Sequence, residues 1–318
     1  MRNYITKNIS KVNINELLNF YKEAFKLRDP IFFNNFKWFY RMGESNYEPI
    51  VIFEKGKIIA HAGLIPENIK YNNKNFKFIW FTDLVVLPEF RKTGFGEQII
   101  KERMKTCENQ ITFCNDLSLQ IFKKLQWKES YSTSRYIKPI FFDKFYFKKY
   151  LHKEDFKNLK IHKIDEKLIR DILPFEKKNN VQDFACFLRD EKWFEWKFLK
   201  CPFKTDILCF DYNSQYVLAF FDKRKKSRRL NILYSTEKSL QKSKIFKLIQ
   251  IWAGEKNINL IWYVSHSKYS GDEIFSFITK KRINFAFKTK DKILNDVLKK
   301  GIINSQGGDS DIGYMGLL

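Results

Sequence analysis

The chain has 318 residues, of which 44% are hydrophobic and 17% aromatic, which allows two packed cores and excludes a disordered protein. The formal net charge of +23 attracts anionic ligands, but the basic residues are spread along the chain. We therefore expect no specific nucleic-acid partner and interpret the densest basic cluster, residues 223–229, as a solvated hairpin loop.

Cysteine usage and hydropathy limit the location of the protein and its metal chemistry. The five cysteines are scattered without metal-ligand spacing, a pattern typical of buried thiols in a reducing compartment. The N-terminal segment is polar, and no stretch approaches 18 consecutive apolar residues, so we expect neither a signal peptide nor a transmembrane segment. These features predict a cytoplasmic protein without a metal ion, and they leave its oligomeric state open.

The first half of the chain alternates between helical and strand-like periodicity. Apolar residues at helical spacing predict a helix over 14–25, with Asn13 as its N-cap. The expected elements that follow are a short helix over 31–40, hairpins over 49–66 and 70–88, a helix over 97–107, a strand over 110–115, a helix over 117–127 and a strand over 131–137. This order predicts an α/β (α+β) fold with a mixed, mostly antiparallel sheet flanked by helices.

The second half repeats this plan faintly. Residues 190–202 share a tryptophan–aromatic core with 32–44, and 205–224 match the hairpin at 49–66. A strand over 229–235, a helix over 238–256 and a strand over 259–265 follow, and 272–285 align with the end of the helix over 117–127. The sequence therefore predicts a tandem duplication with domains at 1–140 and 155–318 and a linker near 139–155.

The segment VLPEFRKTGFGE (86–97) lies between an apolar strand and an amphipathic helix. Gly94 and Gly96 let the backbone approach an anion closely, and a helix N-terminus offers unpaired N–H groups. The segment lacks the third glycine of a dinucleotide-binding fingerprint and the Gly-Lys-Ser/Thr of a Walker loop. The glycines alone leave two readings open, a phosphate cradle and a plain strand-to-helix turn.

With its neighbours, the segment resembles the GNAT superfamily of acyl-CoA-dependent N-acyltransferases. The family hallmark is a strand ending near V-x-P, followed by R/Q-x-x-G-x-G/A and a helix, as in Val86–Pro88, Arg91, Gly94 and Gly96. The family often places an Asn seven residues before an aromatic residue, as Asn115 precedes Phe122. The resemblance covers residues 1–138. The second half has no glycine between 230 and 244, so we expect a degenerate GNAT-like domain without a CoA loop.

The resemblance implies a site for acetyl-CoA or another acyl-CoA as co-substrate. The backbone of Leu84, Val85 and Val86 would pair with the pantetheine arm and polarise the thioester carbonyl. Asn115 would lie near that arm on the other side of the cleft. The loop would hold the pyrophosphate through Arg91, Lys92, Thr93, Gly94, Phe95, Gly96 and Glu97.

Asp83 is the first candidate for the catalytic base. It interrupts the apolar run FIWFTDLVVL, and a carboxylate within a strand is costly to desolvate unless it is used or paired. The second candidate is His61, whose ordinary pKa suits proton transfer, although a satisfied core histidine is the alternative. The family commonly has a tyrosine as general acid where this chain has Phe122, so the source of that proton is open.

The leading functional hypothesis is an N-acyltransferase, and specifically an N-acetyltransferase, acting on a primary amine. A small-molecule acceptor is expected, and the resemblance suggests an amino sugar of a bacterial surface polysaccharide. Two alternatives stay open: an aminoacyl-tRNA-dependent transferase of the peptidoglycan cross-bridge type, and a non-catalytic CoA-binding module. The tail over 305–318 is expected to be a loop and a final strand, with Asp309 and Asp311 as minor candidates for substrate contact.

Overall fold

Helices and strands alternate along the residues that a computed structural model describes, namely 4–26, 33–44, 46–131, 133–140, 151–179, 184–223, 228–237, 239–266 and 279–309. The chain divides into two units. The first comprises Met1–Ser130 with Asn284–Gly301, and the second comprises Tyr131–Ile283 with Ile302–Leu317. Within the described residues, no helix is both long and apolar enough to cross a membrane.

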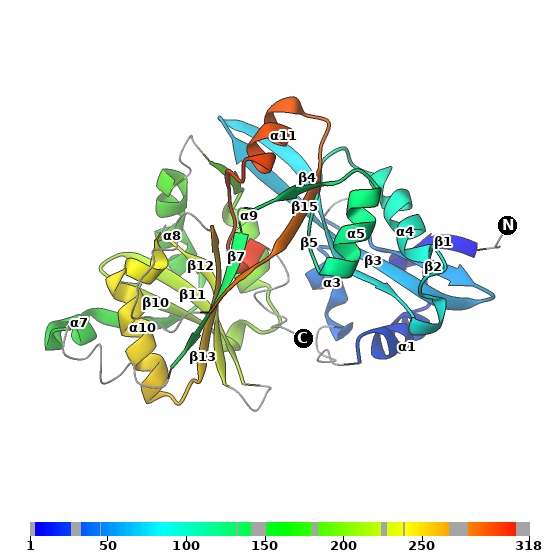
Figure 1. The fold of residues 1–318 in the computed structure, drawn as a ribbon. Coiled ribbons are helices and arrows are strands. Elements are labelled where there is room, and N and C mark those ends of the chain that lie inside the picture. Colours follow the sequence, from blue (N-terminus) through cyan, green and yellow to red (C-terminus); the bar gives the residue numbers. More distant parts are fainter. Residues whose placement is uncertain are drawn as a thin grey trace. The chain divides into compact units, whose positions relative to one another are not determined.

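The first unit is built on a mixed sheet with the strand order β1-β2-β3-β4-β5-β15-β6 (Figure 1). Its neighbouring strands are antiparallel except for the parallel pair β4–β5. Its elements are β1 (Tyr4–Asn8), α1 (Ile14–Ala24), α3 (Phe36–Phe39), β2 (Ile50–Glu54), β3 (Lys57–Tyr71), β4 (Lys74–Val86), α4 (Phe95–Met104), β5 (Gln110–Cys114), α5 (Asp116–Lys124), β6 (Lys128–Ser130), β15 (Asn284–Lys288) and α11 (Lys292–Lys299).

The second unit contains a sheet with the order β8-β10-β11-β12-β13-β7-β14. Here too the neighbours are antiparallel except for one parallel pair, β12–β13. Its elements are β7 (Thr133–Pro139), α7 (Lys153–Asn158), β8 (Leu159–Lys163), α8 (Glu166–Asn179), β9 (Ala185–Phe187), α9 (Glu191–Phe194), β10 (Ile207–Tyr212), β11 (Gln215–Asp222), β12 (Arg229–Ser235), α10 (Lys244–Glu255), β13 (Leu260–His266), β14 (Thr279–Arg282) and β16 (Ile303–Asn304).

The two sheets therefore have the same sequence of parallel and antiparallel pairings. The predicted mixed, mostly antiparallel sheets flanked by helices are present. In each sheet the strand beside the parallel pair comes from a distant part of the chain: β15 pairs with β5 in the first, and β7 pairs with β13 in the second. The common pattern is compatible with the predicted duplication.

Local turn chemistry fixes the two hairpins of the first sheet. Lys55 (φ 50°) and Gly56 (φ 80°) form the first turn, and Asn72 (φ 45°) and Asn73 (φ 61°) form the second. Two-residue turns with positive φ match the right-handed twist of the paired strands, and asparagine and glycine tolerate that backbone conformation. The predicted hairpins are present and share one long central strand, β3.

Other expectations differ from the structure. The units do not divide at 1–140 and 155–318, because β7 pairs with β13 and β15 pairs with β5 and β6. Thr279–Arg282 form strand β14 rather than the end of a helix, since they pair with β7. The helix expected over 31–40 is interrupted at Asn35: among the described residues, 33–34 and Phe36–Phe39 are helical. Residues 141–150 of the expected linker and 224–227 of the basic cluster lie outside the described residues.

The core of the first unit positions the loop after β4. Ile99 and Ile100 of α4 pack against Ile79 and Phe81 of β4, together with Phe122 of α5. Burying large aliphatic and aromatic side chains contributes about 1.5–3 kcal/mol each. The start of α4 is thereby held beside the end of β4.

Candidate functional site

The centre of the candidate site is the point where β4 and β5 separate. These parallel strands pair at Ile79–Gln110, Trp80–Ile111 and Phe81–Thr112, whereas β4 continues to Val86. Leu84 to Val86 are partly exposed. A cavity of about 210 Å³ lies in this region, and its lining includes Asp83, Leu84, Cys114, Asn115 and Phe122. The end of β4 thus borders a cavity on the side where β5 has left it.

Asp83 occupies a bulge in β4. The register between β3 and β4 moves from Gly63–Thr82 to His61–Val85, which places two residues of β4 opposite one residue of β3. Asp83 has φ 50°, in the left-handed region, which Asp tolerates better than most residues. A bulge redirects side chains, and Asp83 is the one carboxylate among the cavity's described lining residues.

Tyr40 holds the Asp83 carboxylate. The buried Tyr40 hydroxyl donates a hydrogen bond of 2.6 Å to Asp83 Oδ2. The tyrosine ring lies close to Gly63, where a Cβ would come within 2.6 Å of Tyr40 Cε1. Gly63 therefore makes room for the ring, and that ring delivers the hydroxyl to the bulge.

His61 lies beneath the bulge rather than in the cavity. Its side chain is fully buried, with Nδ1 3.0 Å from the Asp83 carbonyl oxygen and Nε2 3.1 Å from the Tyr21 hydroxyl. A carbonyl oxygen can only accept, so Nδ1 carries a proton. This geometry supports the Asp83 backbone, and a direct catalytic role of His61 stays a prediction.

The loop after β4 ends at a helix N-terminus with an open approach. Lys92 (φ 62°) and Gly94 (φ 94°) turn the chain into α4, and Gly94 makes no side-chain cap. A Cβ on Gly94 would meet nothing within 4 Å. Thr93 Oγ1 donates to the Phe90 carbonyl oxygen at 2.5 Å, and Arg91 Nε donates to the Val86 carbonyl oxygen at 3.2 Å. Two side chains therefore brace the loop, and the N-cap residue Gly94 offers no side-chain cap to the first amides of α4.

Glu97 adds a negative charge to this first turn. Its carboxylate forms ion pairs of 2.6 Å with Lys101 and Lys124. Hydrogen bonds from these two ammonium groups lower the pKa of Glu97 to about 2. The side chain therefore ties α4 to α5, and contact with a ligand through its backbone amide stays a prediction.

Asn115 caps the helix on the far side of the cavity. Its Oδ1 accepts hydrogen bonds from the backbone N–H of Ser118 at 2.9 Å and from the Ser118 hydroxyl at 2.8 Å. The predicted cofactor-side asparagine thus lines the cavity and also starts α5. Phe122, one turn beyond Ser118, is buried at the same cavity and packs edge-on against Phe81.

Three further residues at this site, Tyr40, Cys114 and Ser118, are not among those that the sequence motifs predict. Tyr40 belongs to a segment whose aromatic residues predict a core position, whereas the glycine in AHAGL indicates that another group approaches β3 closely. Cys114 and Ser118 line the cavity, and both flank Asn115, which was identified. Burial, followed by the charges of Glu129 and Asp116, raises the pKa of Cys114 to about 12.

Other candidates do not converge on this cavity. Asp309 is fully buried in the second unit, where its carboxylate accepts two hydrogen bonds from Arg189. Asp311 lies outside the described residues. Among the described residues, no group of three or more His, Cys, Asp or Glu side chains is arranged to hold a metal ion.

Part of the sequence is similar to a known protein family. A family model described as "Acetyltransferase (GNAT) domain" matches residues 6–114, about a third of the chain. That range includes Asp83, His61 and the loop, and it ends one residue before Asn115. A search of curated proteins finds no match to the sequence.

Solved structures extend the likeness of the fold over most of the chain. A GCN5-related N-acetyltransferase from Anabaena variabilis is 11% identical with a TM-score of 0.60, covering 90% of this chain and 72% of that one. A second, from Kribbella flavida, is 10% identical with a TM-score of 0.57, covering 89% and 71%. The Saccharomyces cerevisiae N-myristoyltransferase with bound myristoyl-CoA is 14% identical with a TM-score of 0.58, covering 91% and 83%. The chain therefore has a GNAT acyltransferase fold.

Proposed function

We propose that this protein is an N-acyltransferase that moves an acyl group from acyl-CoA to a primary amine. The observation that carries this proposal is the partly exposed end of β4, which lies beside a cavity and leads into the open N-terminus of α4. Pantetheine carries amide groups that can pair with a strand edge, and a pyrophosphate suits a helix N-terminus. Along the chain, the strand edge comes before the helix N-terminus. In CoA, counted from the thiol, the pantetheine likewise comes before the pyrophosphate.

The reaction forms a C–N bond and breaks a C–S bond. The amine nitrogen attacks the thioester carbonyl, whose developing negative charge is stabilised by backbone N–H groups of Leu84 to Val86. Asp83 accepts the proton that the amine loses, and CoA leaves as the thiolate. Tyr40 and His61 act as positioning residues, because they hold the carboxylate and the carbonyl oxygen of Asp83.

The leaving thiolate has no tyrosine to protonate it at position 122. Phe122 cannot donate a proton, although its ring is at the cavity. The Ser118 hydroxyl lies one helical turn earlier on α5 and lines the same cavity. Because this hydroxyl already donates its one proton to Asn115 Oδ1, we assign the stabilisation of the thiolate to a water molecule at the cavity.

The acyl group is proposed to be acetyl, and the acceptor to be an amino sugar of a surface polysaccharide. The GCN5-related N-acetyltransferases among the structural neighbours favour acetyl, whereas the N-myristoyltransferase makes a longer chain the natural competitor. A thiol-release assay with acetyl-CoA, myristoyl-CoA, amino sugars, polyamines and peptides decides among them. Release that occurs only with peptides would contradict the amino-sugar proposal.

Calorimetric titration with acetyl-CoA and desulfo-CoA tests the cofactor. Saturable binding supports the proposal, and its absence contradicts it and favours the aminoacyl-tRNA-dependent alternative. Saturable binding without thiol release from any acceptor pool would instead favour a non-catalytic CoA-binding module.

Asp83→Asn tests the proposed base. Asparagine also tolerates positive φ, so the bulge is kept while the charge is lost. We expect kcat to fall by about 100-fold or more, since general-base catalysis is worth about that much, with an unchanged Kd for acetyl-CoA. Turnover that is unaffected by this substitution would remove Asp83 from its proposed role.

A further inference from the structure

The second unit contains a cleft at the position that corresponds to the acyl-CoA cleft of the first. Strands β12 and β13 pair in parallel at Arg229–Leu260, Leu230–Ile261 and Asn231–Trp262, while β12 continues to Ser235. The register between β11 and β12 shifts so that Leu233 is an extra residue on β12. In the first unit, β4 likewise has a bulge directly after its last pairing with β5. Both sheets therefore open at the same point of the same topology.

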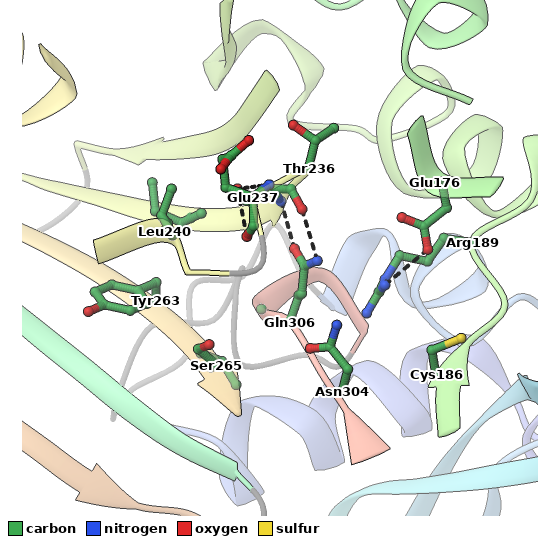
Figure 2. Close-up of a pocket in the computed structure, with 14 residues that line it drawn as sticks. Glu176, Cys186, Arg189, Thr236, Glu237, Leu240, Tyr263, Ser265, Asn304 and Gln306 are labelled. Atoms are coloured by element: carbon green, nitrogen blue, oxygen red, sulfur yellow. Dashed lines mark hydrogen bonds and ion pairs between the residues drawn. The ribbon is translucent and has the colours of Figure 1, made fainter. Parts of the chain in front are cut away.

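The cleft of the second unit is filled by a segment near the C-terminal end of the chain. This segment, residues 303–309, consists of β16, which pairs in parallel with β9, and a 3₁₀ turn over Gly307–Asp309. Its Gln306 side chain accepts a hydrogen bond of 2.6 Å from the Ser235 backbone N–H and donates one of 3.1 Å to the Ser235 carbonyl oxygen (Figure 2). One primary amide thus pairs with both main-chain groups of Ser235, the last residue of β12.

Two glycines allow this segment to lie directly on β12. A Cβ on Gly307 would come within 2.4 Å of the Ile232 carbonyl oxygen, and one on Gly308 would come within 2.9 Å of the Leu233 carbonyl oxygen. Contacts this close to backbone atoms cannot be relieved by moving a flexible side chain. The glycine pair in SQGGD is therefore explained by close packing on the strand.

A buried ion network holds the segment in place. Arg189 donates hydrogen bonds of 2.8 and 2.6 Å to the two carboxylate oxygens of Asp309, and a third of 3.1 Å to Glu176. All three side chains are buried. The Gln306 backbone N–H also donates to Asp309 at 2.6 Å, which locks the amide and the carboxylate into one turn.

The remaining space is too small for a cofactor arm. The cavity between the segment, β12 and β13 has a volume of about 30 Å³, which suits a single water molecule. The helix after the cleft also differs from its counterpart, because Ser243 caps α10 with its own hydroxyl, whereas α4 follows the uncapped Gly94. A phosphate would therefore find the amide of Phe246 already paired.

We propose that residues 303–309 occupy the second cleft in the place that the pantetheine arm takes in the first, with the Gln306 amide standing in for a pantetheine amide. The chain then has one acyl-CoA site, and its second cleft holds residues 303–309 of the same chain instead of a ligand. The inference rests on the proposed function only for the identity of the ligand in the first cleft. The seating of the segment can be measured without CoA.

Hydrogen–deuterium exchange tests this seating in the full chain. Gly307→Ala forces the segment away from β12, so we expect amides over 231–237 to exchange at least tenfold faster than in the wild type. Gln306→Ala removes the side-chain amide and should accelerate exchange over the same residues, 231–237. This variant provides the test if Gly307→Ala does not fold. Gly56→Ala, a glycine change in the first unit, should leave 231–237 unchanged. Wild-type exchange over 231–237 in both segment variants would overturn the proposal.

Adding acetyl-CoA to the wild type separates this proposal from the proposed function. We expect slower exchange over 84–97, no change over 231–243, and one bound acetyl-CoA per chain by native mass spectrometry. Protection of 231–243 would overturn the occupied second cleft. Protection of neither segment would contradict acyl-CoA binding, while the variants would still decide where residues 303–309 lie.

Discussion

At the residue scale, the site depends on how one aspartate is held. The left-handed backbone of Asp83 sends its carbonyl oxygen to His61 and its carboxylate to Tyr40. Left-handed backbone is costly for most residues with a side chain, and it persists where the surrounding contacts enforce it. Two neighbouring strands and the segment with Tyr40 supply those contacts, so the geometry of the carboxylate is fixed before any ligand binds.

Tyr40→Phe should separate positioning from folding. The variant keeps the ring that packs against Gly63 and removes the hydroxyl that donates to Asp83. Because a hydrogen bond to a charged group is worth about 1.5–3 kcal/mol, we expect kcat to fall by about tenfold with an unchanged KM for acetyl-CoA. Steady-state kinetics measure this, with Tyr47→Phe as the matched control. A loss confined to KM would contradict a positioning role.

Cys114 should not act as a nucleophile at neutral pH, although it lines the cavity. Burial raises its pKa from 9.0 to about 12, so it stays a thiol at pH 8, and its thiolate fraction rises about tenfold with each pH unit up to 12. We expect iodoacetamide to label it at pH 8 at least 100-fold more slowly in the folded than in the urea-unfolded protein. Acyl transfer should accordingly be direct, with sequential kinetics. Equal labelling in both states would contradict the thiol assignment.

At the scale of elements, the end of one strand and the start of one helix carry the proposed site. The core side chains of α4 and α5 fix both elements against β4. The loop between β4 and α4 needs a positive φ at Gly94, and a Cβ at this residue would meet nothing within 4 Å. Proposed cofactor binding is therefore a property of backbone placement, and the side chains of Arg91 and Thr93 brace the loop.

Gly94→Ala should weaken acyl-CoA binding more than it weakens the fold. Left-handed backbone costs a residue with a Cβ about 1–2 kcal/mol, so relieving that strain would shift the loop and the first amides of α4. We expect the Kd for acetyl-CoA to rise about tenfold or more by calorimetry.

Gly56→Ala is the matched control for that loop variant. Gly56 has φ 80° with open space around it, but it belongs to the turn between β2 and β3. The two variants should lose similar stability, and only Gly94→Ala should lose affinity. An equal loss of affinity in both would contradict the role of the loop.

At the scale of the whole molecule, the position of a strand in the chain does not decide which sheet it joins. Strand β15 follows most of the second unit in sequence, yet it pairs with β5 and β6 in the first sheet. Its Phe285 ring is fully buried and lies against Trp80 and Phe113. The first unit is therefore completed only after most of the chain has been synthesised.

Phe285→Ala should destabilise the first unit although the residue lies late in the chain. Truncating a buried phenylalanine costs about 3–5 kcal/mol because it leaves a cavity. We expect the urea midpoint of the first unit to fall and acetyl-CoA to raise it again, since a ligand stabilises the state it binds. Exchange of amides over 110–114 reports on the unit directly. Unchanged exchange there would contradict the pairing of β15 with β5.

The sequence by itself determined the local elements and the glycine loop. Hairpin turns, helix caps and the loop after β4 depend on a few adjacent residues, so the sequence alone indicates them, as Asn13 and Gly94 illustrate. Tertiary structure alone decided which sheet contains β7 and which contains β15. Their pairing partners, β13 and β5, are more than a hundred residues away in the chain. It also decided that Tyr40 reaches Asp83 and that Gln306 reaches Ser235. Such contacts depend on the folded path of the whole chain, which no local pattern encodes.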